Sequence, residues 1–297
     1  MLAAARLVGG SRRQRCMPTM MGGFLNRVSG WFYGSSGADD ETRPATDTSL
    51  CYWSGREDDF VARDVYEDFA GPKLLGPPGR PLRLLALHGT GSNNDITSIQ
   101  LVSLEWHEKA VVDCLAGPLG ASPYNSSFPL MSELPFKTWW RGGATAQTLR
   151  PALVGVLGFI DAHGPYDGLY GFSAGAQLVA ALSAPGMAAA LGSRRSWRFV
   201  VCACGVSVAN GAADELLRTA RPDEEDLPEK AMDDIDLPSL HIIGRKDVCR
   251  PMSVELAKTF REPTVVYHDG GHELPLTLRK NAAFKAEVHG FLERQAR

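Results

Sequence analysis

The sequence predicts an α/β fold with a mostly parallel sheet and helices on both of its faces. Short apolar or β-branched runs alternate with helix-like segments, which is the pattern of parallel strands joined by helical crossovers. Three of these runs are followed directly by glycine, which permits a sharp change of chain direction. The runs expected to be strands are 82–87, 111–112, 169–170, 199–204, 240–243 and 264–267.

The helix-like segments lie between and after these strands. Small residues predict a helix at 176–182, and another helix-like run follows at 251–260. With Pro151 near its start, one helix is expected to have an apolar stripe of Leu149, Leu153, Val156, Leu157 and Ile160. The last helix is expected to face the sheet with Phe284, Val288, Phe291 and Leu292.

The segment Gly171-Phe172-Ser173-Ala174-Gly175 stands between an expected strand and an expected helix. A G-x-S-x-G motif in that context is typical of a nucleophile elbow, the sharp turn that exposes the serine of an α/β-hydrolase. As a bare pattern the motif is weak, and the near-match Gly205-Val206-Ser207-Val208-Ala209 occurs in the same chain. The prediction of a nucleophile at Ser173 therefore depends on finding a base, an acid and an oxyanion hole in the expected order.

An acid and a base follow the elbow serine in that order. Asp247 comes three residues after Gly244, which ends the strand at 240–243, and His272 follows the next strand. His268 is the alternative base, but it continues its strand, whereas two glycines before His272 let that loop fold back over the sheet edge. Among the other carboxylates, Asp269 lies too close to the histidines and Asp236 precedes its strand. We therefore expect Asp247 as the acid and His272 as the base.

The oxyanion hole is expected to use two backbone N–H groups. One belongs to Ala174, the residue after the serine, and the other to Thr90 in the glycine-rich loop that follows the first strand. His88 and His241 end or interrupt strands, and we interpret both as hydrogen-bonded structural histidines. The spacing of His268 and His272 could suggest a metal site, but the intervening glycines argue against a helix and no third ligand is evident, so no metal is predicted.

Five stretches together resemble the serine hydrolase FSH family, which includes the ovarian-cancer-associated hydrolase and fungal polyketide-releasing thioesterases. They are residues 84–93, Trp139-Trp140, 171–176, 237–247 and 270–275. The resemblance implies an α/β-hydrolase with little or no lid, acting on carboxylic esters or thioesters, with Ser173, Asp247 and His272 as its triad. It also implies that Trp139 and Trp140 lie near the substrate pocket. The chain departs from the family at 111–118, where the family often has Asp-Ala-Pro-His, and this affects the expected pocket shape.

The chain is expected to have two parts: an amino-terminal extension at 1–80 and the hydrolase domain at 81–297. The extension ends in a Pro/Gly-rich linker, and residues 1–38 contain arginines but no acidic residue. We expect a cytoplasmic protein, because the six cysteines do not suggest a disulfide scaffold. The alternatives for 1–38 are a mitochondrial or other organellar transit peptide and a start further downstream. The acidic stretch 223–236 is interpreted as a solvated excursion, with a lid as the alternative.

The predicted function is hydrolysis of a small-molecule ester or thioester through an acyl-enzyme, without any metal or organic cofactor. A net charge of −3 gives no reason to propose nucleic acid as a partner, and no apolar run is long enough for an integral membrane segment. Two alternatives remain: an acyltransferase that uses the same triad, and a non-catalytic binding module that keeps the fold. Labelling by a fluorophosphonate would separate the binding module from the enzymes, and an assay with acyl acceptors would separate the transferase from the hydrolase.

Overall fold

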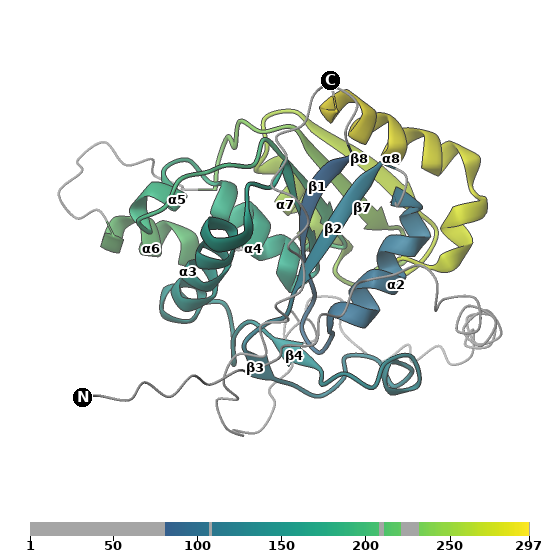
Figure 1. Ribbon diagram of the computed structural model, residues 1–297, viewed down its shortest axis with the longest axis horizontal. Coiled ribbons are helices and arrows are strands. Elements are labelled where there is room, and N and C mark those ends of the chain that lie inside the picture. The colour runs from purple at the N-terminus through teal and green to yellow at the C-terminus, as the bar shows by residue number, and fades with distance from the viewer. Residues whose placement is uncertain (1–80, 107–108, 208–210, 221–231, 297) are drawn as a thin grey trace, which may run out of the picture.

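A six-stranded parallel sheet forms the centre of the described chain (Figure 1). The computed structural model describes residues 81–106, 109–207, 211–220 and 232–296, so the extension at 1–80 lies outside the described residues. The strand order is β2-β1-β5-β6-β7-β8, and every neighbouring pair is parallel. The strands are β1 (Leu82–Leu87), β2 (Ala110–Leu115), β5 (Gly168–Phe172), β6 (Phe199–Ala203), β7 (Ser239–Gly244) and β8 (Pro263–His268).

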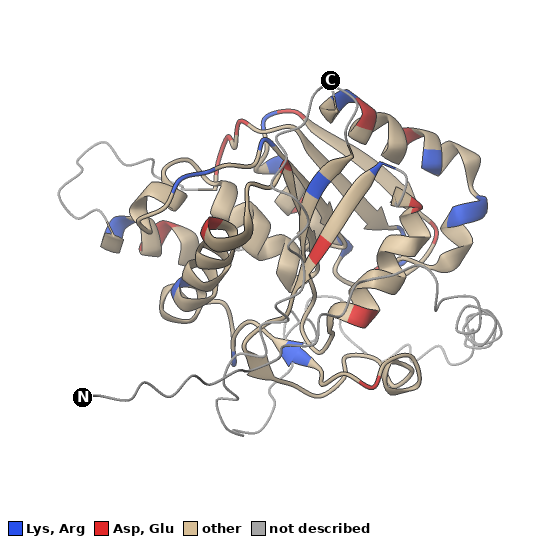
Figure 2. Cartoon of the chain, in the orientation of Figure 1, with Lys and Arg blue, Asp and Glu red and all other residues tan. Residues whose placement is uncertain are grey.

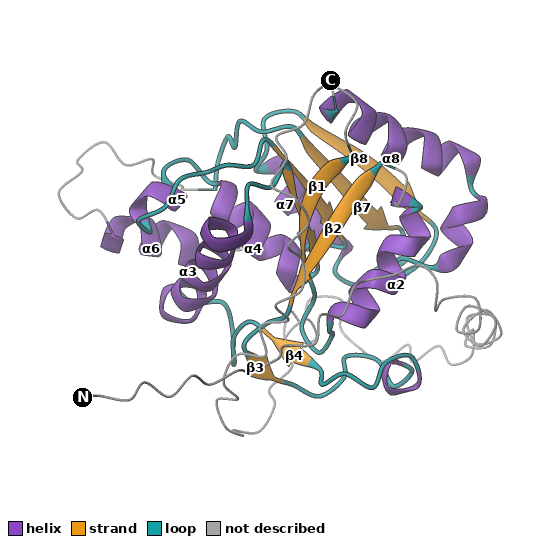
Figure 3. Cartoon of the chain, viewed as in Figure 1, coloured by secondary structure: helices purple, strands orange, loops and turns teal. Residues whose placement is uncertain are grey.

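Helices cover both faces of this sheet, as Figure 3 shows by element type. One face packs against α3 (Ala146–His163), α4 (Ala174–Ser183), α5 (Met187–Ala190), α6 (Ala212–Ala220) and α7 (Arg250–Lys258). The other face packs against α2 (Asn94–Leu104), α8 (Ala282–Gln295) and the short 3₁₀ helix η5 (Leu276–Lys280). The predicted parallel sheet with helices on both faces, the α/β-hydrolase arrangement, is therefore confirmed.

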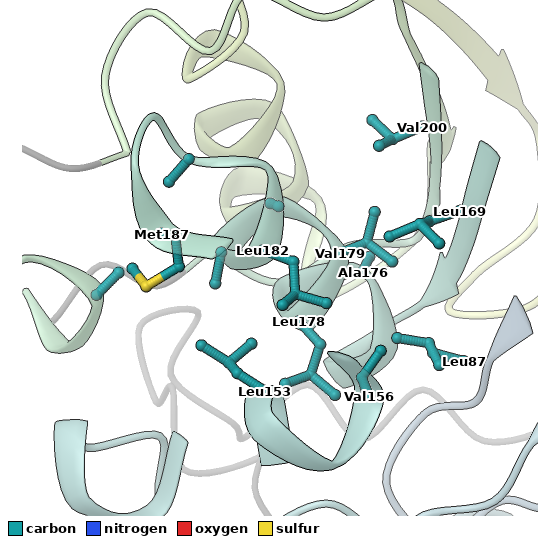
Figure 4. Close-up of a cluster of buried hydrophobic side chains, with 14 of the residues drawn as sticks. Leu87, Leu153, Val156, Leu169, Ala176, Leu178, Val179, Leu182, Met187 and Val200 are labelled. Atoms are coloured by element: carbon teal, nitrogen blue, oxygen red, sulfur yellow. The ribbon is translucent and has the colours of Figure 1, made fainter. Parts of the chain in front are cut away.

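The core lies mainly between the sheet and α3 and α4 (Figure 4). Leu153 and Val156 of α3 face Leu178 of α4, and Leu87 and Leu169 contribute from the strands. The apolar stripe expected on α3 is buried, and so is the expected face of α8. Because α4 is buried along its whole length and carries no charged residue, it is held rigidly beneath the sheet's central strands. It is this helix whose first turn follows the elbow serine.

Side-chain caps define where several helices begin. The Asn93 side chain accepts a hydrogen bond from the Ile96 N–H at the start of α2, and Asn281 does the same for α8. Helix α3 begins with a capping box between Thr145 and Thr148. Pro151 was expected near the start of α3, but the helix begins earlier, at Ala146, so the proline lies inside it and removes one helical N–H.

A partly buried ion pair joins the first two described strands, β1 and β2. Arg83 of β1 donates to Asp113 of β2 at 2.8 Å, and the Tyr166 hydroxyl donates to the same carboxylate oxygen at 2.8 Å. The Arg83 guanidinium also lies over the Tyr166 ring, 4.6 Å from its centroid. Asp113 belongs to the stretch 111–118 in which the sequence departs from the family pattern. The structure thus gives that stretch a role in joining strands.

Residues 116–145, between β2 and α3, form the longest described insertion into the alternating pattern. It contains β3 (Leu119–Gly120), the 3₁₀ helix η4 (Phe128–Leu130) and β4 (Lys137–Thr138), and β3 pairs with β4 in a small antiparallel sheet. A bridge between Ser92 and Lys137 attaches it to the loop that follows β1. This insertion therefore lies at the carboxyl edge of the main sheet, the edge at which the elbow also lies.

Basic and acidic residues are interspersed over the described elements (Figure 2). Among the helices that the structure describes, none is both long and apolar enough to cross a membrane. Most of the acidic stretch 223–236 lies outside the described residues, so its lid alternative is not addressed. At its described end Ile235 is fully buried, which corrects the expectation of a solvated excursion at that position.

Candidate active site

Ser173 occupies the turn between β5 and α4 with φ of 53° and ψ of −116°. Positive φ is unfavourable for a residue with a side chain, so the surrounding structure must hold this turn in place. Glycines on both sides make the turn possible. A Cβ on Gly171 would collide with the Ala176 backbone nitrogen, and a Cβ on Gly175 would collide with the Leu87 carbonyl oxygen of β1. The predicted nucleophile elbow is thus present, and Ser173 is 8% exposed.

His272 bridges the elbow serine and Asp247. Its Nε2 lies 2.9 Å from Ser173 Oγ, and its Nδ1 lies 2.8 Å from Asp247 Oδ2. The other carboxylate oxygen, Oδ1, accepts the backbone N–H of Cys249 at 2.7 Å. Since the carboxylate accepts from both groups, it favours the imidazole tautomer with a proton on Nδ1 and a free lone pair on Nε2. That lone pair faces the serine hydroxyl, which is the geometry of a catalytic triad.

The loops that carry the acid and the base are joined to each other. The Lys246 N–H donates to the Gly270 carbonyl at 3.0 Å, and the Arg245 N–H donates to the His268 carbonyl at 2.8 Å. A Cβ on Gly244 would collide with the Gly271 carbonyl, so glycine at the end of β7 is what allows the two loops to approach. The acid and the base are therefore positioned as one unit at the carboxyl ends of β7 and β8.

The alternative base and acids lie elsewhere. His268 ends β8 with its ring buried, its Nδ1 accepts the Gly270 N–H at 3.1 Å, and burial lowers its pKa. Asp269 and Asp236 form ion pairs with exposed arginines, and their side chains are themselves largely exposed. The structure thus brings His272, and neither His268 nor these carboxylates, together with the serine and Asp247.

The two predicted oxyanion-hole residues lie on either side of Ser173. Ala174 is the first residue of α4, so its N–H belongs to the helix amino end, where N–H groups have no partner within the helix. Thr90 lies in the loop after β1, and its hydroxyl lies 3.2 Å from that of Thr138 in the insertion. This loop approaches the nucleophile closely, because a Cβ on Gly89 would lie 3.1 Å from Ser173 Cβ.

His88 holds in place the loop that follows β1, which is predicted to contribute to the oxyanion hole. Its Nδ1 lies 2.6 Å from the Gly89 carbonyl, and its Nε2 accepts the Gly117 N–H at 2.8 Å. The Trp139 indole N–H donates to the His88 carbonyl at 2.8 Å, and the two rings stack with centroids 5.1 Å apart. Burial lowers the pKa of His88 to about 4, so the ring is neutral. The interpretation of His88 as a structural histidine agrees with these contacts.

The remaining residues of interest from the sequence are buried. His241 packs against Phe260, its Nε2 lies 3.2 Å from Ser239 Oγ, and burial lowers its pKa to about 3. Trp139 and Trp140 both belong to the core cluster on the α3 and α4 face. That Trp139 and Trp140 line a substrate pocket stays a prediction.

Three residues next to His272 were not predicted from the sequence. Tyr124 in the insertion and Phe172 at the end of β5 both lie against the imidazole, with ring centroids 5.5 Å and 5.3 Å from it. Cys204 follows β6, and its sulfur belongs with Asp247 and His272 to a group of ligand-type atoms within 4.8 Å of one another. Burial, then the Asp247 charge, raises the pKa of the Cys204 thiol well above its usual value. Phe172 and Cys204 could have been found by asking which residues end neighbouring strands, whereas nothing in the sequence marks Tyr124.

A cavity of about 350 Å³ lies away from this site. Its lining includes Pro238 and Ser239 at the start of β7, Thr264 of β8, and Phe291 and Arg294 of α8. These residues are at the amino ends of the strands, whereas the triad is at the carboxyl ends. Ligands of open α/β sheets bind outside the carboxyl ends. We therefore base the function on the triad and not on this cavity.

A strained serine after a central strand, a histidine and an aspartate on the next loops, and helices on both faces define a serine hydrolase of the α/β-hydrolase fold. Comparison with known proteins gives the same class: the "Serine hydrolase (FSH1)" family matches residues 79–284. The chain belongs to this serine hydrolase family, as the resemblance implied.

Relatives and solved structures give the extent of the similarity. The chain is 29% identical over 208 residues to "Esterase OVCA2" of Mus musculus, which covers 62% of this chain and 84% of that protein. It is 25% identical over 222 residues to "Hydrolase phiM" of a fungal species, covering 69% of this chain and 94% of that protein. The crystal structure of Zea mays acyl-protein thioesterase 2 aligns with 75% of this chain and 97% of its own, at 16% identity and a TM-score of 0.48.

Proposed function

We propose that the protein hydrolyses carboxylic esters or thioesters of small molecules through an acyl-enzyme on Ser173. The observation that carries the proposal is the continuous hydrogen-bonded series from Ser173 Oγ through both nitrogens of His272 to Asp247. The curated relatives include proteins named esterases, which supports the ester class of substrate. The inclusion of thioesters rests on the same chemistry, because a thioester carbonyl is attacked by the same nucleophile.

In the first half of the proposed cycle, His272 Nε2 takes the proton of Ser173 as Oγ bonds to the substrate carbonyl carbon. The carbonyl oxygen becomes an oxyanion that accepts hydrogen bonds from the N–H groups of Ala174 and Thr90. Each such donor contributes about 3 kcal/mol to the lowering of the barrier. Asp247 stabilises the imidazolium that forms. The bond from carbon to the leaving oxygen or sulfur then breaks, and His272 gives its proton to the departing alcohol or thiol.

In the second half, water takes the place of the alcohol or thiol. His272 removes a proton from the water as its oxygen attacks the acyl carbon, and the same two N–H groups hold the second oxyanion. Collapse of this intermediate breaks the bond to Ser173 Oγ, which recovers its proton from His272. The products are a carboxylic acid and the regenerated serine, so the cycle is balanced with water as the only co-reactant.

A fluorophosphonate probe and an esterase assay test the proposal together. We expect the probe to label the wild-type chain and not Ser173→Ala, and p-nitrophenyl butyrate hydrolysis to fall by on the order of 10³-fold or more in Ser173→Ala and His272→Ala. His268→Ala is the matched control, because its ring does not contact the serine. Loss of activity in His268→Ala with retention in His272→Ala would contradict the assignment of the base. Transfer of the butyryl group to an added alcohol in preference to water would show an acyltransferase instead.

We also propose that residues 1–80 are separate from the catalytic domain and that the protein is cytoplasmic. Every residue assigned to chemistry lies after Arg80, and the family match begins at residue 79. A chain that starts at Pro77 should fold and hydrolyse short p-nitrophenyl esters as well as the full chain. Insolubility of that chain would show that the extension packs on the domain. Imaging of the full chain with a carboxy-terminal fluorescent tag tests the location, and accumulation in mitochondria would support the transit-peptide alternative.

A further inference from the structure

Tyr124 packs against the imidazole of His272, the group that the alcohol or thiol portion of a substrate must approach. In the proposed cycle His272 Nε2 gives its proton to the leaving atom, so that atom must come within hydrogen-bond reach of the imidazole. A solvent-accessible side chain that contacts the imidazole can therefore also contact the leaving group. Two aromatic rings contact the imidazole, Tyr124 with centroids 5.5 Å apart and Phe172 with centroids 5.3 Å apart.

These two rings differ in their access to solvent. Phe172 is 5% exposed and belongs to the core cluster beneath the sheet, on the face covered by α2 and α8. Tyr124 is 41% exposed, although it packs against the catalytic histidine. A group entering from solvent and approaching His272 can therefore contact the Tyr124 ring, whereas Phe172 is already covered by protein.

The backbone of Tyr124 is fixed to the loop that holds the oxyanion hole. Its N–H donates to the Gly91 carbonyl at 2.9 Å, and the Gly91 N–H donates to the Lys137 carbonyl at 2.9 Å. Gly91 has φ of 65°, and a Cβ there would lie 2.6 Å from both the Ser122 carbonyl oxygen and the Tyr124 nitrogen. A residue at the tip of a free loop would sample many positions, but these contacts fix the Tyr124 backbone to the loop after β1, and its ring packs against His272.

We propose that Tyr124 forms the wall of a leaving-group subsite, and that this subsite favours esters or thioesters whose alcohol or thiol portion carries a flat apolar group. The ring offers such a group a face or an edge for aromatic contact. Burial, followed by the Asp247 charge, raises the pKa of its phenol, so the ring that faces the leaving group is neutral. This inference rests on the proposed function, because it assumes that His272 protonates the leaving group.

The experiment varies the leaving group while the acyl group stays the same. Methyl, phenyl and 2-naphthyl butyrate are compared by kcat/KM, which reports acylation, the step in which the leaving group departs. In Tyr124→Ala and in Tyr124→Leu we expect the ratio of kcat/KM for each aryl ester over methyl butyrate to fall about tenfold relative to wild type. Tyr124→Phe should keep the wild-type ratio because it keeps the ring. Leu130→Ala is the matched control, since Leu130 is 66% exposed on the same insertion and contacts no triad residue in the described part of the chain.

An unchanged aryl-to-methyl ratio in both ring-deleted variants would overturn the proposal, whatever happens to the absolute rates. A second series with p-nitrophenol as the constant leaving group and acyl chains of increasing length provides a further check. There the chain-length preference should be the same in wild type and Tyr124→Ala, and a shift in it with no change in the leaving-group ratio would place Tyr124 on the acyl side instead. Failure of the proposed function itself would be distinguishable, because wild-type hydrolysis would then not depend on Ser173.

Discussion

Replacement of Asp247 by asparagine tests whether Asp247 holds the His272 imidazole in the tautomer with its proton on Nδ1. In the structure Oδ1 of Asp247 accepts the Cys249 N–H, and Oδ2 faces His272 Nδ1. An asparagine must keep its carbonyl oxygen toward the Cys249 N–H, because two donors cannot face each other. Its NH₂ group is then directed at His272 Nδ1 and can donate only if that nitrogen carries no proton. The proton moves to Nε2, which can no longer accept the proton of Ser173.

The expected loss follows from this wrong tautomer. We expect kcat for p-nitrophenyl butyrate to fall about 10⁴-fold in Asp247→Asn, which corresponds to about 5.5 kcal/mol of barrier. The side chain keeps its size and both hydrogen-bonding positions, so the melting temperature should change little. The assay measures kcat and KM together with thermal unfolding followed by circular dichroism, which separates loss of chemistry from loss of fold.

A second carboxylate provides the control. Asp269 lies on the base loop, in the same region of the molecule, but its side chain is 90% exposed and pairs with Arg245. Asp269→Asn should therefore change kcat by less than about twofold. If Asp247→Asn lost less than tenfold, or if Asp269→Asn lost as much as Asp247→Asn, the assignment of Asp247 as the acid would be refuted.

Three further predictions concern stability, each measured as the free energy of unfolding in urea. Gly175→Ala should lose about 3 kcal/mol, because its Cβ would collide with the backbone at Leu87. The control Gly155→Ala lies on an open helix surface and should be neutral or stabilising by up to about 1 kcal/mol. Equal effects of the two substitutions would refute this reasoning. Asp113→Ala should cost about 2 kcal/mol, because the partly buried Arg83 loses its carboxylate partner and the buried Tyr166 hydroxyl loses its acceptor, and a loss below about 1 kcal/mol would contradict it. Burial lowers the pKa of His88 to about 4 and that of His241 to about 3, both from 6.5, so the unfolded chain binds two extra protons as the pH falls below 6.5. Stability should therefore fall by about 2 kcal/mol for each histidine from pH 7 to pH 5, and no loss would contradict this.

The strands and the triad could be predicted because the signals that mark them are local. Apolar runs ending in glycine marked β5 and β7, and the order of Ser173, Asp247 and His272 followed from where strands end. The choice of His272 over His268 also rested on local chemistry, since Gly270 and Gly271 allow the loop to turn back. These features could be predicted because the residues next to each motif determine its geometry.

Other parts of the molecule depend on contacts between distant segments and were not predicted. The small β3–β4 sheet consists of two-residue strands, which leave no periodic pattern. Helix α2 carries buried polar residues such as Thr97 and Gln100, so it lacks the apolar stripe of α3. Tyr124 contacts His272 although the two residues are 148 positions apart in the sequence, and a backbone hydrogen bond to Gly91 holds its segment in place. No local feature of that segment indicates the contact.

The location of the acid and the base on the last two strands makes activity sensitive to the attachment of a single strand. In the described sheet β8 has β7 as its one neighbour, whereas β5, which leads into Ser173, is held on both sides. Local opening of a protein begins where the fewest contacts must break. When β8 detaches from β7, the base His272 leaves the active site, whereas the nucleophile Ser173 keeps its position after the central strand β5. We therefore expect that activity is lost on mild heating through detachment of this edge before the whole fold unfolds, so that stabilising the β7–β8 pairing would prolong activity.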